Sequence, residues 1–242
     1  MPRRPVVGVM GSGSTPEIEL AEPLARLLAQ RGVSLLTGGG AGTMESVCAA
    51  FAAVPGRTGT IIAVVPGIPQ AQAESWDARE GLDLPPVAGH ATERGSSDVV
   101  NEVRARGGFK PGPTVAPPGY PNEWAEVVIQ THLATSGTAG TDLTSRNHIN
   151  ILSSDVVVAL PGGPGTLSEV QLANIYGKQA IAFLGPEEDE KTIASLATAA
   201  DLEVPIARTI DEVDAFLQEH LMGRLQTLST GLDWAPRLED ER

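Results

Sequence analysis

The feature that most constrains the fold is a series of short aliphatic runs, each followed by a glycine-rich turn and a helix-like segment. Residues 6–10 (VVGVM), 33–37 (VSLLT) and 156–161 (VVVALP) are such runs, and the turns GSGS, GGGAG and GGPGT follow them. Strands that are apolar at every position are typical of a parallel sheet buried between two layers of helices. The sequence therefore predicts an α/β fold with a doubly wound, mainly parallel sheet and helices on both faces.

Helix signals occupy the segments between these runs. Leucines at positions 20, 24, 27 and 28 have the spacing of a buried helix stripe, and Thr15 with Pro16 is typical of a capped helix start. Further helices are predicted over 43–54, 143–154, 166–176 and 211–225, and further strands over 60–66, 126–131, 180–184 and 204–207.

One stretch interrupts this alternation. Residues 67–122 are rich in Pro, Gly and charge, with only 96–106 resembling a short helix. Segments of this length without regular structure are usually functional or disordered. We therefore predict a single domain over 1–230 that carries an insertion at about 67–122 and ends in a tail over 231–242. The insertion is interpreted as a lid, an oligomer arm or a mobile loop.

Composition and charge narrow the function classes. The chain is 41% hydrophobic but only 4% aromatic, which indicates an aliphatic core, and its formal net charge is −13. That sign argues against nucleic acid as a partner, although backbone N–H groups can still bind a small anion locally. The single cysteine, Cys48, excludes an internal disulfide and is predicted to be a buried filler. No spacing of His or carboxylates indicates a metal site.

Membrane and export signals are also missing from the sequence. No apolar run approaches the ~18–20 residues of a membrane span. The first apolar run has only five residues before glycines interrupt it, which is too short for a signal peptide. We therefore expect a soluble cytoplasmic protein without a membrane partner.

The three glycine turns predict a ligand cleft. In a parallel sheet the carboxyl ends of strands share one edge, where open α/β folds bind ligands. Glycine permits close approach to the main chain, and a helix N-terminus attracts anions. The predicted phosphate-binding residues are Gly162, Gly163, Gly165 and Thr166. The predicted ligand-binding residues are Gly11, Ser12, Gly39, Gly40, Gly42, Thr43, Met44 and Glu45. No lysine follows the glycines as in a P-loop, and GSGSTP lacks the dinucleotide pattern.

Two charged residues near the third turn have alternative interpretations. Thr166 and Glu169 have the spacing of a capping box, in which the glutamate bonds back to the start of its helix. Alternatively, the carboxylate acts on a ligand. Arg146 is either a solvated helix residue or an anion-binding group directed toward the end of a strand.

The stretches TGGGAGTMESV and SRNHINILSSDVVVALPGGPGTLSEV resemble the LOG (LONELY GUY) family, often labelled possible lysine decarboxylases, and equally the related molybdenum cofactor carrier proteins. The family motif P-G-G-x-G-T-x-x-E is complete from Pro161 to Glu169, and Arg146 stands at the position of the family's upstream arginine. The resemblance covers roughly 1–66 and 124–185.

The resemblance implies a Rossmann-like fold and, in the LOG branch, hydrolysis of nucleoside 5′-monophosphates to free base and ribose 5-phosphate. Arg146 and Glu169 would be catalytic, the PGGxGT turn would hold the 5′-phosphate, and no cofactor would be required. In the carrier branch the ligand would be the molybdenum cofactor, a pterin phosphate. Lysine decarboxylation would need an electron sink, and nothing in the sequence marks one.

The sequence departs from the LOG pattern at several positions. Thr43, Met44 and Glu45 replace the usual Leu-Met-Gly, Asn147 replaces a lysine, and Pro164 fills a variable position that is often Tyr. These departures leave the base or pterin open and favour the carrier branch more than the motif alone does. The resemblance also implies a homodimer or tetramer, with the Ala-rich helices 43–54 and 166–176 as candidate apolar faces.

Overall fold

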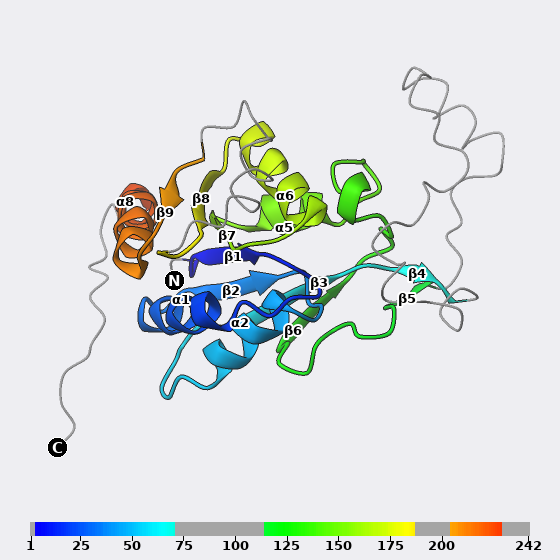
Figure 1. Cartoon of the computed structure of the whole chain (residues 1–242), viewed down its shortest axis with the longest axis horizontal. Helices are drawn as coiled ribbons and strands as arrows, with labels where there is room; N and C mark the ends of the chain where they lie inside the picture. The colour runs from blue at the N-terminus through cyan, green and yellow to red at the C-terminus, as the bar shows by residue number, and fades with distance from the viewer. Residues whose placement is uncertain (1–2, 71–113, 187–203, 229–242) are drawn as a thin grey trace.

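The computed structural model describes residues 3–70, 114–186 and 204–228 (Figure 1). The strands of its main sheet are β1 (Val6–Met10), β2 (Ser34–Thr37), β3 (Ile61–Val65), β6 (Val127–Gln130), β7 (Val156–Ala159), β8 (Gln179–Phe183) and β9 (Ile206–Ala207). The helices are α1 (Ile18–Gln30), α2 (Thr43–Ala52), α5 (Asn147–Ser153), α6 (Pro164–Ile175), α8 (Ile210–Leu228) and the short 3-10 helix η2 (Gly137–Ala139).

The seven strands form one sheet in the order β6-β3-β2-β1-β7-β8-β9, and every neighbouring pair is parallel. The chain runs outward from β1 through β2 and β3 to β6, and then crosses back to β7 on the other side of β1. This confirms the predicted doubly wound parallel sheet. It also places the reversal of strand order between β1 and β7, where open α/β folds bind ligands.

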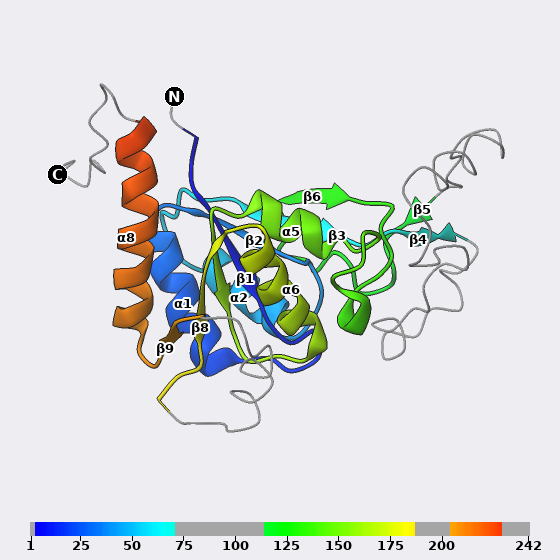
Figure 2. The ribbon, with the colours of Figure 1, turned by 90° about the horizontal axis from the view of Figure 1, so that it is seen from above.

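The aliphatic strands are buried because helices cover both faces (Figures 1 and 2). Val7 and Val9 of β1 belong to a core that contains Leu24 of α1, whereas Met10 belongs to a second core with Leu172 of α6. This alternation is the two-residue period of a strand. Helices α1, α2 and α8 therefore cover one face, and α5 and α6 cover the other.

Two helices begin later than predicted. Helix α1 starts at Ile18 without a side-chain cap, so the expected cap at Thr15 is wrong. The hydroxyl of Ser12 instead accepts hydrogen bonds from the N–H groups of Ser14 and Thr15, which folds this segment into a turn. Helix α5 starts at Asn147 rather than 143, because Ser145 Oγ accepts from the Asn147 N–H at 3.2 Å and closes a turn there.

The described ends of the insertion form a small ribbon that the sequence did not predict. Strand β4 (Ile68–Pro69) pairs antiparallel with β5 (Thr114–Val115), and both extend from the edge at which β3 ends (Figure 1). Most of the insertion, including the possible helix over 96–106, lies outside the described residues, as does the tail over 231–242. The roles proposed for the insertion stay predictions.

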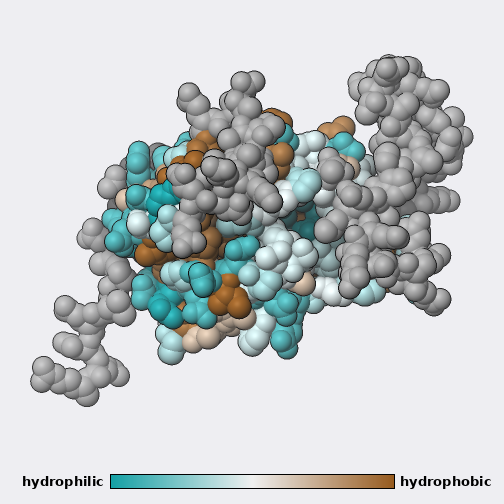
Figure 3. All heavy atoms as spheres, viewed as in Figure 1, coloured by the Kyte–Doolittle hydropathy of each residue, from teal (hydrophilic) through white to brown (hydrophobic). Residues whose placement is uncertain are grey.

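The two helices proposed as oligomer faces differ. Phe51 of α2 is fully buried, and α2 packs against α1, so its apolar side is already covered. On the other face of the sheet, Leu152 is 51% and Ile175 is 67% exposed. Figure 3 shows separate hydrophobic patches among hydrophilic residues on the side viewed there.

Among the described residues, no helix is both long and apolar enough to cross a membrane.

Candidate functional site

The three glycine turns meet at the carboxyl edge of the sheet. The N–H of Ser12, in the first turn, donates to the Pro161 carbonyl at 3.2 Å, immediately before the third turn. The Ser12 carbonyl in turn accepts from the N–H of Thr43, at the end of the second turn, at 2.9 Å. The first turn therefore joins the other two by main-chain hydrogen bonds.

The glycines of the second turn, Gly38–Thr43, are needed because of the atoms around them. Gly42 has a φ of 63°, and a Cβ atom there would lie 2.6 Å from the carbonyl oxygen of Ser12. Gly39 has a φ of 74°, and a Cβ would lie 2.8 Å from the Ala63 side chain. Any residue other than glycine is therefore strongly disfavoured at both positions. These two glycines of the second turn are therefore packed against protein atoms.

The third turn, Gly162–Thr166, contains open positions. A Cβ atom at Gly163 would meet nothing within 4 Å, and one at Gly165 would come no closer than 3.7 Å to Gly137. Helix α6 starts at Pro164, so helix geometry leaves the N–H groups of Gly165 and Thr166 without an acceptor inside the helix. This turn has free space together with main-chain donors at a positive helix end, which are the requirements of an anion site.

Thr166 does not present its hydroxyl to that open space. Its side chain is 2% exposed, and Oγ1 is enclosed without a hydrogen-bond partner. A Cβ atom at Gly162 would lie 2.1 Å from this oxygen, so the hydroxyl lies directly beneath the turn. The glycine at 162 therefore makes room for Thr166, whereas the glycines at 163 and 165 leave room outside.

Two residues at the end of the insertion, missed by the sequence analysis, pack onto the second turn. The main-chain N–H of Asn122 donates to the Gly39 carbonyl at 2.7 Å, and its Nδ2 donates to the Gly40 carbonyl at 3.0 Å. The ring of Tyr120 lies against Gly40, where a Cβ would be 2.8 Å from a ring carbon. The contact of Asn122 with Gly40 spans 82 positions in the sequence, and no local pattern signals it.

Arg146 is buried, so its interpretation as a solvated helix residue is wrong. It is 4% exposed and precedes α5, and its Nη1 donates to the Val64 carbonyl at 2.7 Å. A Cβ atom at Gly38 would lie 2.4 Å from Nη1, so the guanidinium passes directly beneath the second turn. Its Cζ lies 5.5 Å from the centre of the Tyr120 ring, a cation–π distance.

Glu169 is not a helix cap. Because α6 begins at Pro164 after the N-cap Gly163, Thr166 is the third helical residue and the predicted capping box does not form. The Glu169 carboxylate is 8% exposed, and Oε1 accepts a hydrogen bond from Asn150 Nδ2 at 3.0 Å. Glu169 lies one turn after Gly165 and Thr166, on the same side of the helix.

Burial raises the pKa of Glu169 to about 6. The charge of Arg146 and the hydrogen bond from Asn150 act in the opposite direction, since each favours the ionised carboxylate. The carboxyl group therefore titrates near neutral pH, where it can accept a proton. Burial of this carboxyl group does not stabilise the fold. Buried carboxyl groups with a shifted pKa are enriched at functional sites.

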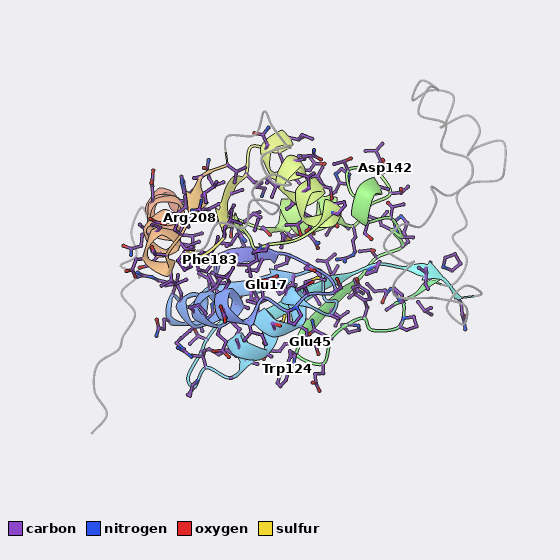
Figure 4. All side chains as sticks on the ribbon, viewed as in Figure 1. Glu17, Glu45, Trp124, Asp142, Phe183 and Arg208 are labelled. Atoms are coloured by element: carbon purple, nitrogen blue, oxygen red, sulfur yellow. The ribbon has the colours of Figure 1, made fainter. Side chains whose placement is uncertain are left out.

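The other predicted ligand residues mainly hold the turns together. Thr43 Oγ1 donates to the Thr15 carbonyl at 2.9 Å, and Gly11 is packed against the Thr43 side chain. Met44 is buried, with its terminal methyl between the first and second turns. Glu45 is exposed in the first turn of α2, and Figure 4 shows it on the α2 side of the sheet, away from Asp142.

The described residues contain no group of three or more His, Cys, Asp or Glu side chains that could hold a metal ion. Cys48 is buried beneath the second turn, 3.7 Å from Thr37 Oγ1, and burial raises the pKa of its thiol to about 11. The filler interpretation of Cys48 is consistent with this position. What the site offers is an open glycine turn at a helix N-terminus and a buried carboxylate on the same helix.

Two solved structures that resemble the chain over nearly its whole length are molybdenum cofactor proteins. The molybdenum cofactor binding protein of the phototrophic bacterium Rippkaea orientalis is 26% identical and has a TM-score of 0.51, over 95% of this chain and 100% of that protein. The molybdenum cofactor carrier protein of Chlamydomonas reinhardtii is also 26% identical, with a TM-score of 0.53, over 91% of this chain and 99% of its own. The Rossmann-like fold implied by the motif is thus confirmed.

Family membership follows from the sequence itself. No curated protein matches the chain significantly. The sequence model of the SLOG cluster4 family, however, matches residues 4–101 and 66–213, which together span most of the chain. These matches include all three glycine turns, Arg146 and Glu169. The chain belongs to the SLOG cluster4 family.

Proposed function

We propose that the third turn binds the phosphate group of a small phosphorylated ligand that carries a heterocyclic base or pterin. The open positions at Gly163 and Gly165 and the free N–H groups at the start of α6 support this. The net charge of −13 does not oppose it, because main-chain donors bind the anion locally. The first and second turns pack against each other beside this site.

We further propose that the bound ligand is a nucleoside 5′-monophosphate and that the protein hydrolyses its N-glycosidic bond. The observation that carries this proposal is Glu169, a buried carboxylate that caps no helix, has a pKa of about 6 and lies on the phosphate-binding helix. Arg146 supports the ionised form of that carboxylate from below the second turn.

In this reaction the C1′–N bond breaks, and its electron pair leaves with the base, which takes up a proton. The oxygen of a water molecule bonds to C1′, and the proton it loses passes to ionised Glu169. Carboxylates perform the same task for oxocarbenium-like transition states in glycosidases. Activity should therefore rise with pH as Glu169 ionises, with a midpoint near its pKa of about 6.

A second candidate function is carriage of a pterin phosphate without chemistry. The two molybdenum cofactor proteins above favour it, because each aligns with nearly its whole length to this chain at 26% identity. In that case the third turn holds the pterin phosphate and Glu169 shapes the pocket. The molybdenum cofactor would then be the cargo of this protein and not a catalytic cofactor.

One experiment separates the two functions. The wild-type protein and Glu169→Gln are incubated with a panel of nucleoside 5′-monophosphates, and free base and ribose 5-phosphate are measured. We expect turnover by the wild type and a loss of about 10²–10⁴-fold in the variant, the usual contribution of a general base. Retention of pterin fluorescence from molybdopterin, with no base released from any nucleotide, would replace hydrolysis by carriage.

We also propose that the chain forms a homo-oligomer through the side of the sheet that carries α5 and α6. The exposed Leu152 and Ile175 support this, since large apolar side chains gathered on one side are typical of an interface. Light scattering at micromolar concentration should detect at least a dimer. A single species at the 25.2 kDa mass of the chain would contradict the proposal.

A further inference from the structure

Asn150 is the residue that contacts the proposed catalytic carboxylate most directly. It lies on α5, one helical turn after Arg146, and is fully buried. Its Nδ2 donates to Glu169 Oε1 at 3.0 Å. Its own main chain is fixed as well, because the Asn150 carbonyl accepts a hydrogen bond from Ser154 Oγ at 2.7 Å. The amide therefore reaches Glu169 from a rigid helix.

An asparagine at this buried position is less stabilising than an aliphatic residue if the side chain only packs. Ile151, the next residue of α5, belongs to an apolar core. Asn150 Oδ1 is buried without a hydrogen-bond partner, which destabilises the folded state. An aliphatic residue would avoid that penalty. The amide is therefore better explained by its single hydrogen bond to Glu169 than by stability.

The direction of that hydrogen bond determines its effect. An amide N–H can donate to a carboxylate oxygen, so it favours the ionised form over the protonated one. It also occupies Oε1, while Oε2 has no hydrogen bond from the described residues. One oxygen is thus held in place and the other is left for the reaction.

We propose that Asn150 is a positioning residue that holds Glu169 by Oε1, keeps it ionised and leaves Oε2 to act on the bound ligand. This inference rests on the proposed hydrolysis for its consequence in turnover, but not for its effect on the carboxyl group. Arg146 is the charged group that acts on the same carboxylate, and it is unchanged in the variants below.

The test compares Asn150→Leu with Asn147→Leu. Asn147 is a matched control, because it lies on the same helix, is 2% exposed and donates through Nδ2 to Ser168 Oγ at 3.0 Å without touching Glu169. The pKa of Glu169 is measured in each protein by carbon-13 NMR of its carboxyl group, assigned by the loss of its signal in Glu169→Gln.

We expect Asn150→Leu to raise the pKa of Glu169 by about one pH unit, the usual size of one lost hydrogen bond to a charged group. The acidic limb of the pH–rate profile should shift by the same amount. The kcat should fall about 10- to 100-fold with little change in KM, because binding is unaffected and only alignment is lost. Asn147→Leu should leave both the pKa and the acidic limb unchanged.

The two proposals fail in different ways. If the wild type hydrolyses nucleotides but Asn150→Leu leaves the pKa of Glu169 in place, the role of Asn150 is overturned and hydrolysis stands. If no protein releases base but the pKa rises in Asn150→Leu alone, hydrolysis is overturned and Asn150 still controls Glu169. If Asn150→Leu does not fold, Asn150→Ala, which removes the amide without adding bulk or charge, must show the same rise for the proposal to survive.

Discussion

The second and third glycine turns look alike in sequence and differ in structure. Both follow a buried aliphatic strand and precede a helix at the same edge of the sheet, where β1 and the first turn lie between them. In the second turn, Gly39 and Gly42 have positive φ, and a Cβ atom at either position would overlap other main-chain or side-chain atoms. In the third, Gly163 and Gly165 lie beside open space. Glycine serves packing in one turn and access in the other.

We expect this difference to separate residues that stabilise the fold from residues that bind the ligand. The second turn encloses Arg146 and is itself held by Asn122, so it acts as a rigid wall. The third turn offers free main-chain donors and is followed on its helix by Glu169. Substitutions in the second turn should therefore damage the fold, and substitutions in the third should damage ligand binding.

The largest effect is expected from Gly42→Ala. A φ of 63° and a Cβ position 2.6 Å from a main-chain oxygen combine strain with overlap that main-chain atoms cannot relieve. Urea denaturation should show a loss of about 3 kcal/mol or more in the free energy of unfolding. Gly56→Ala is the control, because Gly56 has a φ of 71° but no atom within 4 Å of a Cβ. Equal losses in the two variants would show that the second turn is not tightly packed.

The next effect concerns Glu169→Gln and pH. The folded protein holds the Glu169 proton more tightly than the unfolded chain, because its pKa is about 6 instead of 4.5. The stability of the wild type should therefore fall as pH rises from about 4.5 to 6 and stay level above that. The variant lacks this fall, so it should gain about 2 kcal/mol relative to the wild type between pH 4.5 and 7.5.

Urea denaturation at the two pH values measures this gain. Glu45→Gln is the control for the second turn, because Glu45 is exposed at the start of α2. If the free energy of unfolding changes with pH in the same way in Glu169→Gln and Glu45→Gln, the pKa of Glu169 is not raised by burial.

A smaller effect is expected from Gly163→Ala. The added methyl group meets no protein atom within 4 Å, and a φ of −99° suits alanine, so the melting temperature should hardly change. The methyl occupies open space at the third turn, where the phosphate is proposed to bind. The affinity for ribose 5-phosphate should therefore fall about tenfold, equivalent to the loss of one good hydrogen bond. Calorimetric titration measures it.

The matched variant Gly13→Ala adds the same group to the first turn, where the nearest atom is Met44 Cε at 3.8 Å. Its affinity should equal that of the wild type. If Gly13→Ala binds ribose 5-phosphate more weakly than Gly163→Ala does, the phosphate binds at the first turn instead of the third.

The smallest expected signal is the reactivity of Cys48. Burial under the second turn raises the pKa of its thiol to about 11, so it holds little thiolate at neutral pH. Iodoacetamide at pH 7.5 should leave the folded protein unlabelled, and mass spectrometry gives an unambiguous result because the chain has one cysteine. Rapid labelling would indicate that the second turn opens, contrary to its packed structure.

Much of the fold was predictable because burial on both faces leaves a clear pattern. Runs such as 6–10 and 156–161 can be recognised as strands from their aliphatic residues alone. Helix starts were less predictable, since they depend on local competition for hydrogen bonds. Ser12 folds the residues before α1 into a turn, and Pro164 starts α6 two residues before the expected Thr166.

The site was predicted only in outline. The motif located the third turn and Glu169, but the spacing of Thr166 and Glu169 also fits a capping box, and sequence alone cannot show where the helix begins. Asn122 was missed because its contacts are distant in sequence. Asn150 had a usable signal, since it follows Arg146 by four positions and so shares its side of the helix.

The most direct test of the account is a crystal structure of Glu169→Gln with AMP. Removal of the proposed base should preserve the bound nucleotide long enough to observe it. We predict that the phosphate lies against the N–H groups of Gly163, Gly165 and Thr166, with C1′ of the ribose facing residue 169. A phosphate bound instead at the second turn, or a base adjacent to the third turn with the phosphate pointing away, would contradict it.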